Sequence, residues 1–144
     1  MKQLFASEAS QLAPAIACLQ RFWEDKALAL DAGYKVEVSL EEIFFNVVKH
    51  NTAASQISVD LSVADGVVTL VIEDDGSRFD PFSLSAVSID GTIEERAVGG
   101  LGIHLVKEMM DSCTYAFIAE KNTATMSLAI EKVPDDAREK RRCD

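Results

Sequence analysis

The sequence has few basic residues, few cysteines and no long apolar run. Its 14 lysines and arginines are outnumbered by 24 aspartates and glutamates, giving a net charge of −10, which argues against a protein that neutralises the phosphates of duplex nucleic acid. The 3 cysteines are odd in number and lack metal-type spacing, as is typical of a reduced, cytoplasmic chain. No apolar segment approaches the roughly 20 residues of a membrane span. We therefore expect a cytoplasmic protein that contacts neither nucleic acid nor membrane directly.

The composition that remains is that of one ordinary globular domain. The chain has 144 residues, of which 48% are hydrophobic and 26% charged, and this is enough for a single core. The periodic patterns lie within residues 1–133, whereas residues 134–144 are charged without an apolar pattern. We expect one domain over 1–133, followed by a solvated tail.

Apolar residues at helical spacing predict two helices early in the chain. One covers residues 7–26, and the second ends near Asn51 with a poorly defined start. Residues 27–34 between them lack this spacing, and Gly33 is a typical break. We expect a connection there.

Alternating apolar residues predict the strands of a sheet. Residues 2–6 alternate weakly, as in an edge strand. Strands joined by tight turns are antiparallel, and the order of elements favours an α+β, two-layer sandwich, with a mostly antiparallel sheet and the helices on one face. Two pairs of stronger runs predict hairpins: 56–63 with 67–72, and 114–119 with 125–130, the latter pair joined at 120–122.

A glycine-rich stretch, Gly-Gly-Leu-Gly at residues 99–102, follows a segment without sustained periodicity, residues 74–98. An irregular segment of this length is typical of a lid or binding loop. Apolar residues at helical spacing come next, so we expect a loop that opens a helix from Ile103 to about Ser112. Unpaired N–H groups at such a helix start suit an anion. Glycines that only allow close packing are the alternative.

Polar residues cluster on the second predicted helix. Glu42, Asn46 and His50 are four residues apart, which stacks them along one side, and Lys49 flanks that side. A carboxylate, an amide oxygen, a cation and an imidazole there could activate a hydroxyl, hold a magnesium ion and meet a phosphate. An ordinary solvated helix face is the alternative.

Consecutive carboxylates end the second strand of the first hairpin. Asp74 and Asp75 are followed by Gly76, so a carboxylate could be held at the mouth of a pocket and accept a hydrogen bond from an exocyclic amine. The alternative is an ordinary acidic turn, because Asp-Gly is common in turns.

Together these three stretches, in this order and near these separations, resemble the N box and the two glycine boxes of the Bergerat-fold (GHKL, HATPase_c) ATPase and kinase superfamily, which includes gyrase, Hsp90, histidine kinases and MutL. Within it the chain looks most similar to the small bacterial anti-sigma-factor serine kinases, the RsbW/SpoIIAB-like proteins. The likeness covers residues 1–133 and is carried by Asn46-Val47-Val48-Lys49-His50, Asp74-Asp75-Gly76-x-x-Phe79-Asp80-Pro81 and Gly100-Leu101-Gly102-Ile103-His104-Leu105-Val106.

The resemblance implies a site for ATP and Mg²⁺. Glu42 would be the general base that accepts a proton from a serine or threonine hydroxyl of a partner protein, or from water. Asn46 would ligate the Mg²⁺ that bridges the ATP phosphates. Asp74 would accept a hydrogen bond from the adenine amino group, and Gly76 would let the backbone pass close to the base.

The resemblance also implies that the phosphates lie against the glycine-rich stretch, where nucleotide state would alter the lid and hence a partner surface. Residues 80–98 would form this ATP lid. The residues expected to contact the nucleotide here are Gly100, Leu101, Gly102, Arg96, Lys49 and His50.

Some features depart from the family pattern. Arg78 stands where the first glycine box usually has its second glycine, and residues 122–125 (Asn-Thr-Ala-Thr) stand near the usual glycine-threonine element, where no ligand can be assigned. No G-x-x-x-x-G-K-[ST] sequence occurs, which excludes a P-loop. His104 is expected to be a surface residue, because no helical hairpin precedes it to present a phosphoacceptor.

Three functions of different classes are carried forward. The first is an ATP-dependent protein serine/threonine kinase of a partner-switching, transcription-regulating pathway, which binds a sigma factor or another effector and phosphorylates a STAS-type antagonist. The second is a binding module in which ATP sets partner affinity without turnover. The third is an α+β domain without a nucleotide. Homodimers occur among the relatives, and we carry them over as an expectation.

Overall fold

A computed structural model describes residues 1–85 and 93–130, without the side chains of residues 84, 85 and 93–100. It contains a five-stranded sheet in which every pair of neighbours is antiparallel, in the order β1-β2-β3-β5-β4. This confirms the predicted α+β class. The strands are β1 (Lys2–Ala6), β2 (Gln56–Ala64), β3 (Val67–Asp74), β4 (Ser112–Ile118) and β5 (Lys121–Ala129).

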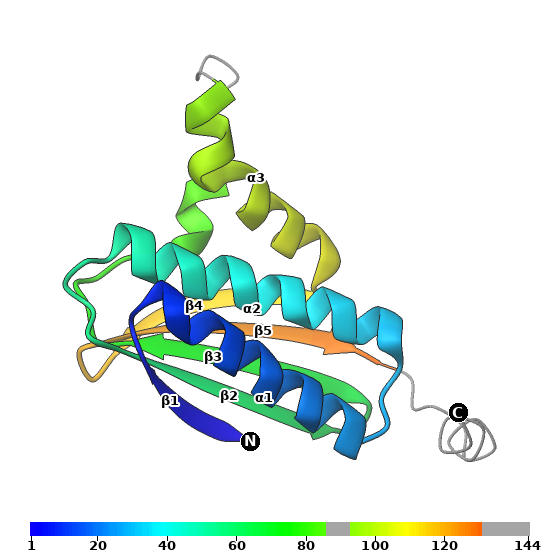
Figure 1. The fold of residues 1–144 in the computed structure, drawn as a ribbon. Coiled ribbons are helices and arrows are strands. Elements are labelled where there is room, and N and C mark those ends of the chain that lie inside the picture. Colours follow the sequence, from blue (N-terminus) through cyan, green and yellow to red (C-terminus); the bar gives the residue numbers. More distant parts are fainter. Residues whose placement is uncertain (86–92, 131–144) are drawn as a thin grey trace.

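The helices lie on one face of the sheet, as Figure 1 shows. Two of them, α1 and α2, are in contact with each other, and α2 also contacts α3. The predicted tail, 134–144, and residues 86–92 of the predicted lid lie outside the described residues. The helices are α1 (Leu12–Asp25), α2 (Leu30–His50) and α3 (Ile93–Met109), with short 3₁₀ turns at Ala9–Gln11 and Pro81–Ser85.

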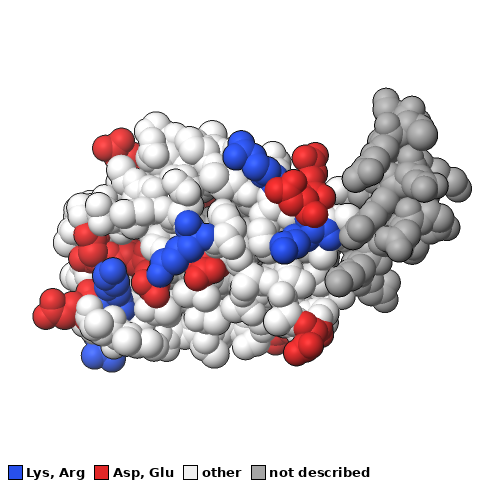
Figure 2. Space-filling view, turned by 90° about the horizontal axis from the view of Figure 1, so that it is seen from below, with Lys and Arg blue, Asp and Glu red and all other residues white. Residues whose placement is uncertain are grey.

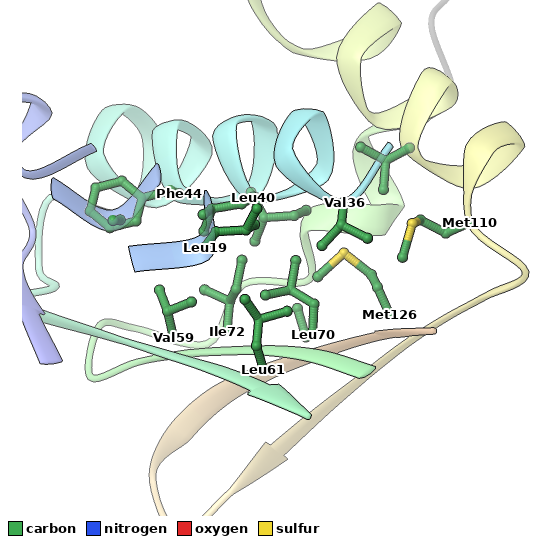
Figure 3. Packing of buried hydrophobic residues seen from close by; sticks show 14 of the residues in the cluster. Leu19, Val36, Leu40, Phe44, Val59, Leu61, Leu70, Ile72, Met110 and Met126 are labelled. Carbon is green, nitrogen blue, oxygen red and sulfur yellow. The ribbon is translucent and has the colours of Figure 1, made fainter. Parts of the chain in front are cut away.

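The core lies between the helices and the sheet, and its residues follow from two periodicities. The sheet supplies alternate residues of its strands, such as Leu61 and Leu70, and the helices supply residues at 3.6-residue spacing, such as Leu40 and Phe44. Figure 3 shows these side chains pointing toward one another across the layer. Ile103 and Val106 of α3 are fully buried as well, so the C-terminal half of α3 is anchored to the same core.

Helix α2 begins earlier than its sequence suggests. The prediction of a connection over residues 27–34 is wrong at its end, because α2 begins at Leu30 and contains Gly33. A Cβ atom at Gly33 would lie 2.7 Å from Nε1 of Trp23, and the indole N–H donates to the carbonyl of Ala29 at 2.8 Å. This glycine therefore admits an indole ring between two helices and does not break the chain.

The second hairpin turns one residue earlier than predicted. Its turn residues are Ala119 and Glu120, both in the left-handed region with φ of 51° and 62°, and β5 begins at Lys121. Such turns usually carry asparagine, aspartate or glycine, so the sequence held no signal for this one. The shift places Asn122 inside β5, where it pairs with Asp74 of β3.

No described helix covers the opposite face of the sheet. It displays mostly short side chains, among them Ser58, Thr69, Thr125 and Ser127, all half-buried. Figure 2 shows this face, on which Lys and Arg are interspersed with Asp and Glu in small groups among uncharged residues. The view contains no continuous basic surface of the kind that binds a nucleic-acid backbone.

Candidate functional site

The site lies where β3 ends and the neighbouring strand β5 begins, beneath the C-terminal end of α2. The inner-facing row of β3 runs through the buried Val68, Leu70 and Ile72 and continues to Asp74, which is only 6% exposed. The inner-facing row of β5 starts at Asn122, which is 3% exposed. A carboxylate and an amide therefore occupy positions that the alternation of the strands assigns to the core.

Three N–H donors meet one oxygen of Asp74. Its Oδ1 accepts from the backbone N–H of Gly76 at 2.9 Å, from Nδ2 of Asn122 at 2.9 Å and from Nδ2 of Asn51 at 3.2 Å. Every hydrogen bond that the described residues donate to this carboxylate falls on Oδ1. Oδ2 is therefore the oxygen left to accept from a ligand.

Burial and hydrogen bonding act in opposite directions on this carboxylate. Desolvation raises the pKa of Asp74 above its usual value, with a smaller contribution from the charge of Asp75, while the hydrogen bonds from Asn122 and Gly76 lower it. Hydrogen bonds donated to a carboxylate favour its charged form. The neighbouring amides therefore help to keep Asp74 ionised.

Asn51, the residue that ends α2, also holds the loop after β3. Its Nδ2 donates to the carbonyl of Ser77 at 2.8 Å, and its Oδ1 accepts from the backbone N–H and the hydroxyl of Ser77, both at 3.2 Å. A Cβ atom at Gly76 would collide with this amide group. The absence of a side chain at Gly76 thus makes room for Asn51.

Asn122 bonds the same loop from the opposite side. Its Nδ2 donates to the carbonyl of Ser77 at 2.8 Å, and its Oδ1 accepts from the backbone N–H of Phe79 at 2.8 Å and from the hydroxyl of Tyr115. The stretch around residue 122, to which the sequence assigned no ligand, therefore supports Asp74 directly.

Asp75 fastens the base of the same loop. Its carboxylate accepts from the backbone N–H groups of Ser55 and Gln56, at 2.7 and 3.0 Å, and from the hydroxyl of Ser55. These bonds lower the pKa of Asp75 to about 2. This carboxylate is exposed and serves the local fold, whereas Asp74 points under the helices.

Asn46 lies one helical turn before His50 on α2, but it is buried rather than solvated. It is 3% exposed, and its Nδ2 has no hydrogen-bond partner among the described residues. A buried amide group without a partner costs about 1–3 kcal/mol. Because this burial is unfavourable, the Nδ2 atom of Asn46 is one whose hydrogen bonding a bound ligand would complete.

Glu42 is half-buried and lies against α3. Desolvation raises its pKa above the usual value, and the charge of Glu41 raises it further. A Cβ atom at Gly102 would collide with the Glu42 carboxylate. Gly102 therefore lets a carboxylate touch the backbone of α3, which brings the predicted base and the last predicted phosphate-binding glycine together.

The glycine-rich stretch does not open a helix. The prediction of a loop at residues 99–102 is wrong, because α3 runs without a break from Ile93 to Met109 and contains Gly100, Leu101 and Gly102. Glycine in a helix is unfavourable by about 1 kcal/mol relative to alanine, but the burial of Ile103 and Val106 outweighs this local preference. The N–H groups of these glycines therefore lie inside a helix and not at its start.

Three more residues predicted to contact the nucleotide have described side chains: Lys49, His50 and Leu101. The Lys49 ammonium lies 5.8 Å from the ring centroid of the exposed Phe45. The His50 ring stacks on Phe79 in the loop after β3, with centroids 6.4 Å apart. Leu101 is 61% exposed.

The predictions for His104 and Arg96 have different outcomes. His104 is exposed and pairs with Glu108 at 3.1 Å, as expected of a surface residue. The side chain of Arg96 lies outside the described residues, although its backbone belongs to α3.

No group of three His, Cys, Asp or Glu side chains suited to a metal ion occurs in the part of the chain that the structure describes. The amide oxygen of Asn46 is a ligand of the kind that suits Mg²⁺, because this ion commonly keeps several waters and binds one or two protein oxygens together with substrate phosphates.

A family model described as the histidine kinase-like ATPase domain matches residues 5–128. The chain belongs to this family. The match begins within β1, ends within β5 and includes the other described strands and helices, so the ATPase-type domain and the fold are those that the ordered motifs predicted. A comparison with curated proteins finds no match.

Two solved structures resemble the chain at low sequence identity, and the first of them shares its fold. The structure of the RsbU and RsbW domains of Rv1364c from Mycobacterium tuberculosis is 13% identical with a TM-score of 0.62, over 93% of this chain and 35% of that one. The histidine kinase AdeS of Acinetobacter baumannii is 14% identical with a TM-score of 0.48, over 92% of this chain and 68% of that one. The chain thus spans about a third of the length of the Rv1364c structure.

The described helices include none that is long and apolar enough to cross a membrane.

Sequence reasoning missed two residues of the site, Asn51 and Asn122. Asn122 had a signal: it lies two residues before Ala124, where the buried inner-facing row Ala124, Met126 and Leu128 of β5 begins, so a longer strand would have placed it in the core. Asn51 had none, because its role depends on where the end of α2 meets the loop after β3.

Proposed function

We propose that the chain is an ATP-binding protein serine/threonine kinase of a partner-switching, anti-sigma-factor type. The observation that carries the proposal is the buried Nδ2 of Asn46, which has no partner among the described residues, one helical turn from a half-buried carboxylate, Glu42, of raised pKa. Membership of an ATPase-type family and an RsbW-like fold support it.

Glu42 has the properties of a general base. A raised pKa makes a carboxylate a better proton acceptor near neutral pH, and burial is what raises it here. In the proposed reaction a partner's serine or threonine hydroxyl attacks the γ-phosphorus of ATP and transfers its proton to a Glu42 carboxylate oxygen. The new O–P bond forms as the bond from the γ-phosphorus to the bridging oxygen breaks, and ADP leaves.

Asn46 would hold Mg²⁺ through its amide oxygen. When bound, the cation would neutralise charge on the phosphates. At the other end of the site Asp74 would accept a hydrogen bond from the adenine amino group, while Lys49, His50 and Arg96 remain candidate nucleotide contacts.

The phosphates would approach α3 at Gly100, Leu101 and Gly102. Within the continuous helix these N–H groups are directed along the helix axis, so we propose that the helix opens at the glycines when nucleotide binds. Three glycines lower helix stability by about 1 kcal/mol each relative to alanine. This low helix stability reduces the free energy needed to open α3 at the glycines.

The partners proposed are proteins: a STAS-type antagonist as phosphoacceptor, a sigma factor or another effector as the sequestered partner, and a second copy of the chain as a homodimer. A net charge of −10 favours basic surfaces on these partners. A pull-down from native cytosol with Mg-ATP and with Mg-ADP, followed by mass spectrometry, would identify nucleotide-dependent partners and phosphosites.

The decisive test compares Glu42→Gln with its neighbour Glu41→Gln in a phosphate-transfer assay with the identified antagonist. The first variant should bind Mg-ATP nearly as the wild type does and lose transfer, and the second should keep both. Unchanged transfer in Glu42→Gln contradicts the assigned role. Mg-ATP binding without ADP or phosphoprotein in the wild type favours the second candidate, a module in which ATP sets partner affinity without turnover.

A further inference from the structure

The loop that follows β3 is bracketed by two amide side chains from distant parts of the chain. Asn51 comes from the end of α2 and Asn122 from the start of β5, and both are 3% exposed. Each donates to the same two acceptors, Oδ1 of Asp74 and the carbonyl of Ser77. Each also accepts a backbone N–H of the loop through its own Oδ1. Two amides that share this pattern fix both the loop and the carboxylate.

This arrangement divides the two oxygens of Asp74 between different tasks. Oδ1 accepts three N–H groups, which fills its acceptor capacity and fixes the plane of the carboxylate. Oδ2 receives no hydrogen bond from the described residues. An ionised carboxylate only accepts hydrogen bonds, so a ligand atom that meets Oδ2 has to be a donor.

We propose that Asn51 and Asn122 are positioning residues that make the site select a purine with an exocyclic amine over a 6-oxo purine. This inference rests on the proposed nucleotide-binding function. A 6-amino group donates to Oδ2, whereas a 6-oxo group brings a second acceptor against it. With its Oδ1 held by three N–H donors, the Asp74 carboxylate cannot rotate, and the same hydrogen bonds oppose the uptake of a proton that would relieve that conflict.

The two amides donate to the same acceptors, but each is held in place by different neighbours. Asn122 is itself fixed by the hydroxyl of Tyr115 on β4, so β4 and β5 hold it in place. Asn51 occupies the space that a side chain at residue 76 would need, which ties its position to Gly76. Loss of either amide therefore leaves Asp74 with one amide donor instead of two, and its carboxylate can rotate more freely.

The test measures the ratio of affinities for Mg-ATP and Mg-ITP by calorimetry. In Asn122→Asp a carboxylate replaces a donor that lies 2.9 Å from Oδ1 of Asp74, so the two carboxyl groups cannot both stay ionised and the pair takes up a proton. With that proton on Oδ2 of Asp74, the residue can donate to a 6-oxo group. Because a hydrogen bond to a charged group contributes about 1.5–3 kcal/mol, the preference for ATP should fall about 10- to 100-fold.

Two more variants complete the test. Asn51→Asp should lower the same ratio by a smaller factor, because its contact with Asp74 is longer at 3.2 Å, and it keeps the proposal testable should Asn122→Asp fail to fold. Thr125→Val, on the open face of β5, is the matched control and should keep the wild-type ratio. A wild-type ratio in both aspartate variants, with thermal unfolding confirming that they are folded, overturns the inference alone. No binding of either nucleotide by the wild type overturns the proposed function with it.

Discussion

Replacing Gly102 by alanine tests the contact between Glu42 and α3. The new Cβ would collide with the Glu42 carboxylate, and overpacking of a rigid site costs about 1–3 kcal/mol. A glutamate carboxylate, however, ends a flexible side chain, and Glu42 is only half-buried. We therefore expect the carboxylate to move away and the helix to keep its place.

The expected magnitude follows from helix propensity. With the collision relieved, alanine in place of glycine should stabilise α3 by about 0.5–1 kcal/mol, a rise of about 2–4 °C in the unfolding temperature. The displaced carboxylate becomes more hydrated, so the pKa of Glu42 should fall toward its ordinary value. Phosphate transfer, where the antagonist is at hand, should fall because the base has left its position.

Gly33→Ala is the matched control. Its Cβ would lie 2.7 to 3.0 Å from atoms of the Trp23 indole, a rigid ring that is 5% exposed and cannot move aside. The same substitution in a helix should here be destabilising by about 1–3 kcal/mol, less about 1 kcal/mol of helix propensity.

The assays are thermal unfolding and a side-chain carboxyl NMR titration of Glu42. If Gly102→Ala is destabilised as much as Gly33→Ala, the carboxylate is rigidly held and the reasoning fails. If the pKa of Glu42 stays raised while stability increases, the carboxylate has not moved, and the contact described between Glu42 and Gly102 is wrong.

Two further predictions concern pH. Burial raises the pKa of Glu42, so its ionisation opposes folding as pH rises through that pKa. In urea unfolding, Glu42→Gln should therefore be more stable than the wild type at pH 7 and equally stable at pH 4. A variant that is less stable than the wild type at pH 7 would contradict this. Hydrogen bonds lower the pKa of Asp75 from 3.8 to about 2, so its contribution is present above pH 3.8 and lost as pH falls toward 2. Asp75→Asn should lose no more than about 1 kcal/mol at pH 7, because the carboxylate is exposed, with a smaller difference at pH 3; a difference independent of pH would refute the assignment.

The sequence alone determined the features that depend on residues close together in the chain. Alternation of apolar residues specified the hairpins and the inner face of the sheet, and helical spacing specified the buried side of α2. The same regularities put Asp74 at the end of a core-facing row and Glu42 one turn from Asn46. The α+β fold and most of the candidate site could therefore be predicted.

Tertiary packing decided the rest. Glycines at residues 99–102 favour a loop on local propensity, but the burial of Ile103 and Val106 keeps them in a helix. Asn51 and Asn122 acquire their role only when the end of α2 and the start of β5 meet at the loop after β3. A hydrogen bond between residues so far apart in the chain leaves no local pattern, because the geometry that forms it belongs to the folded molecule as a whole.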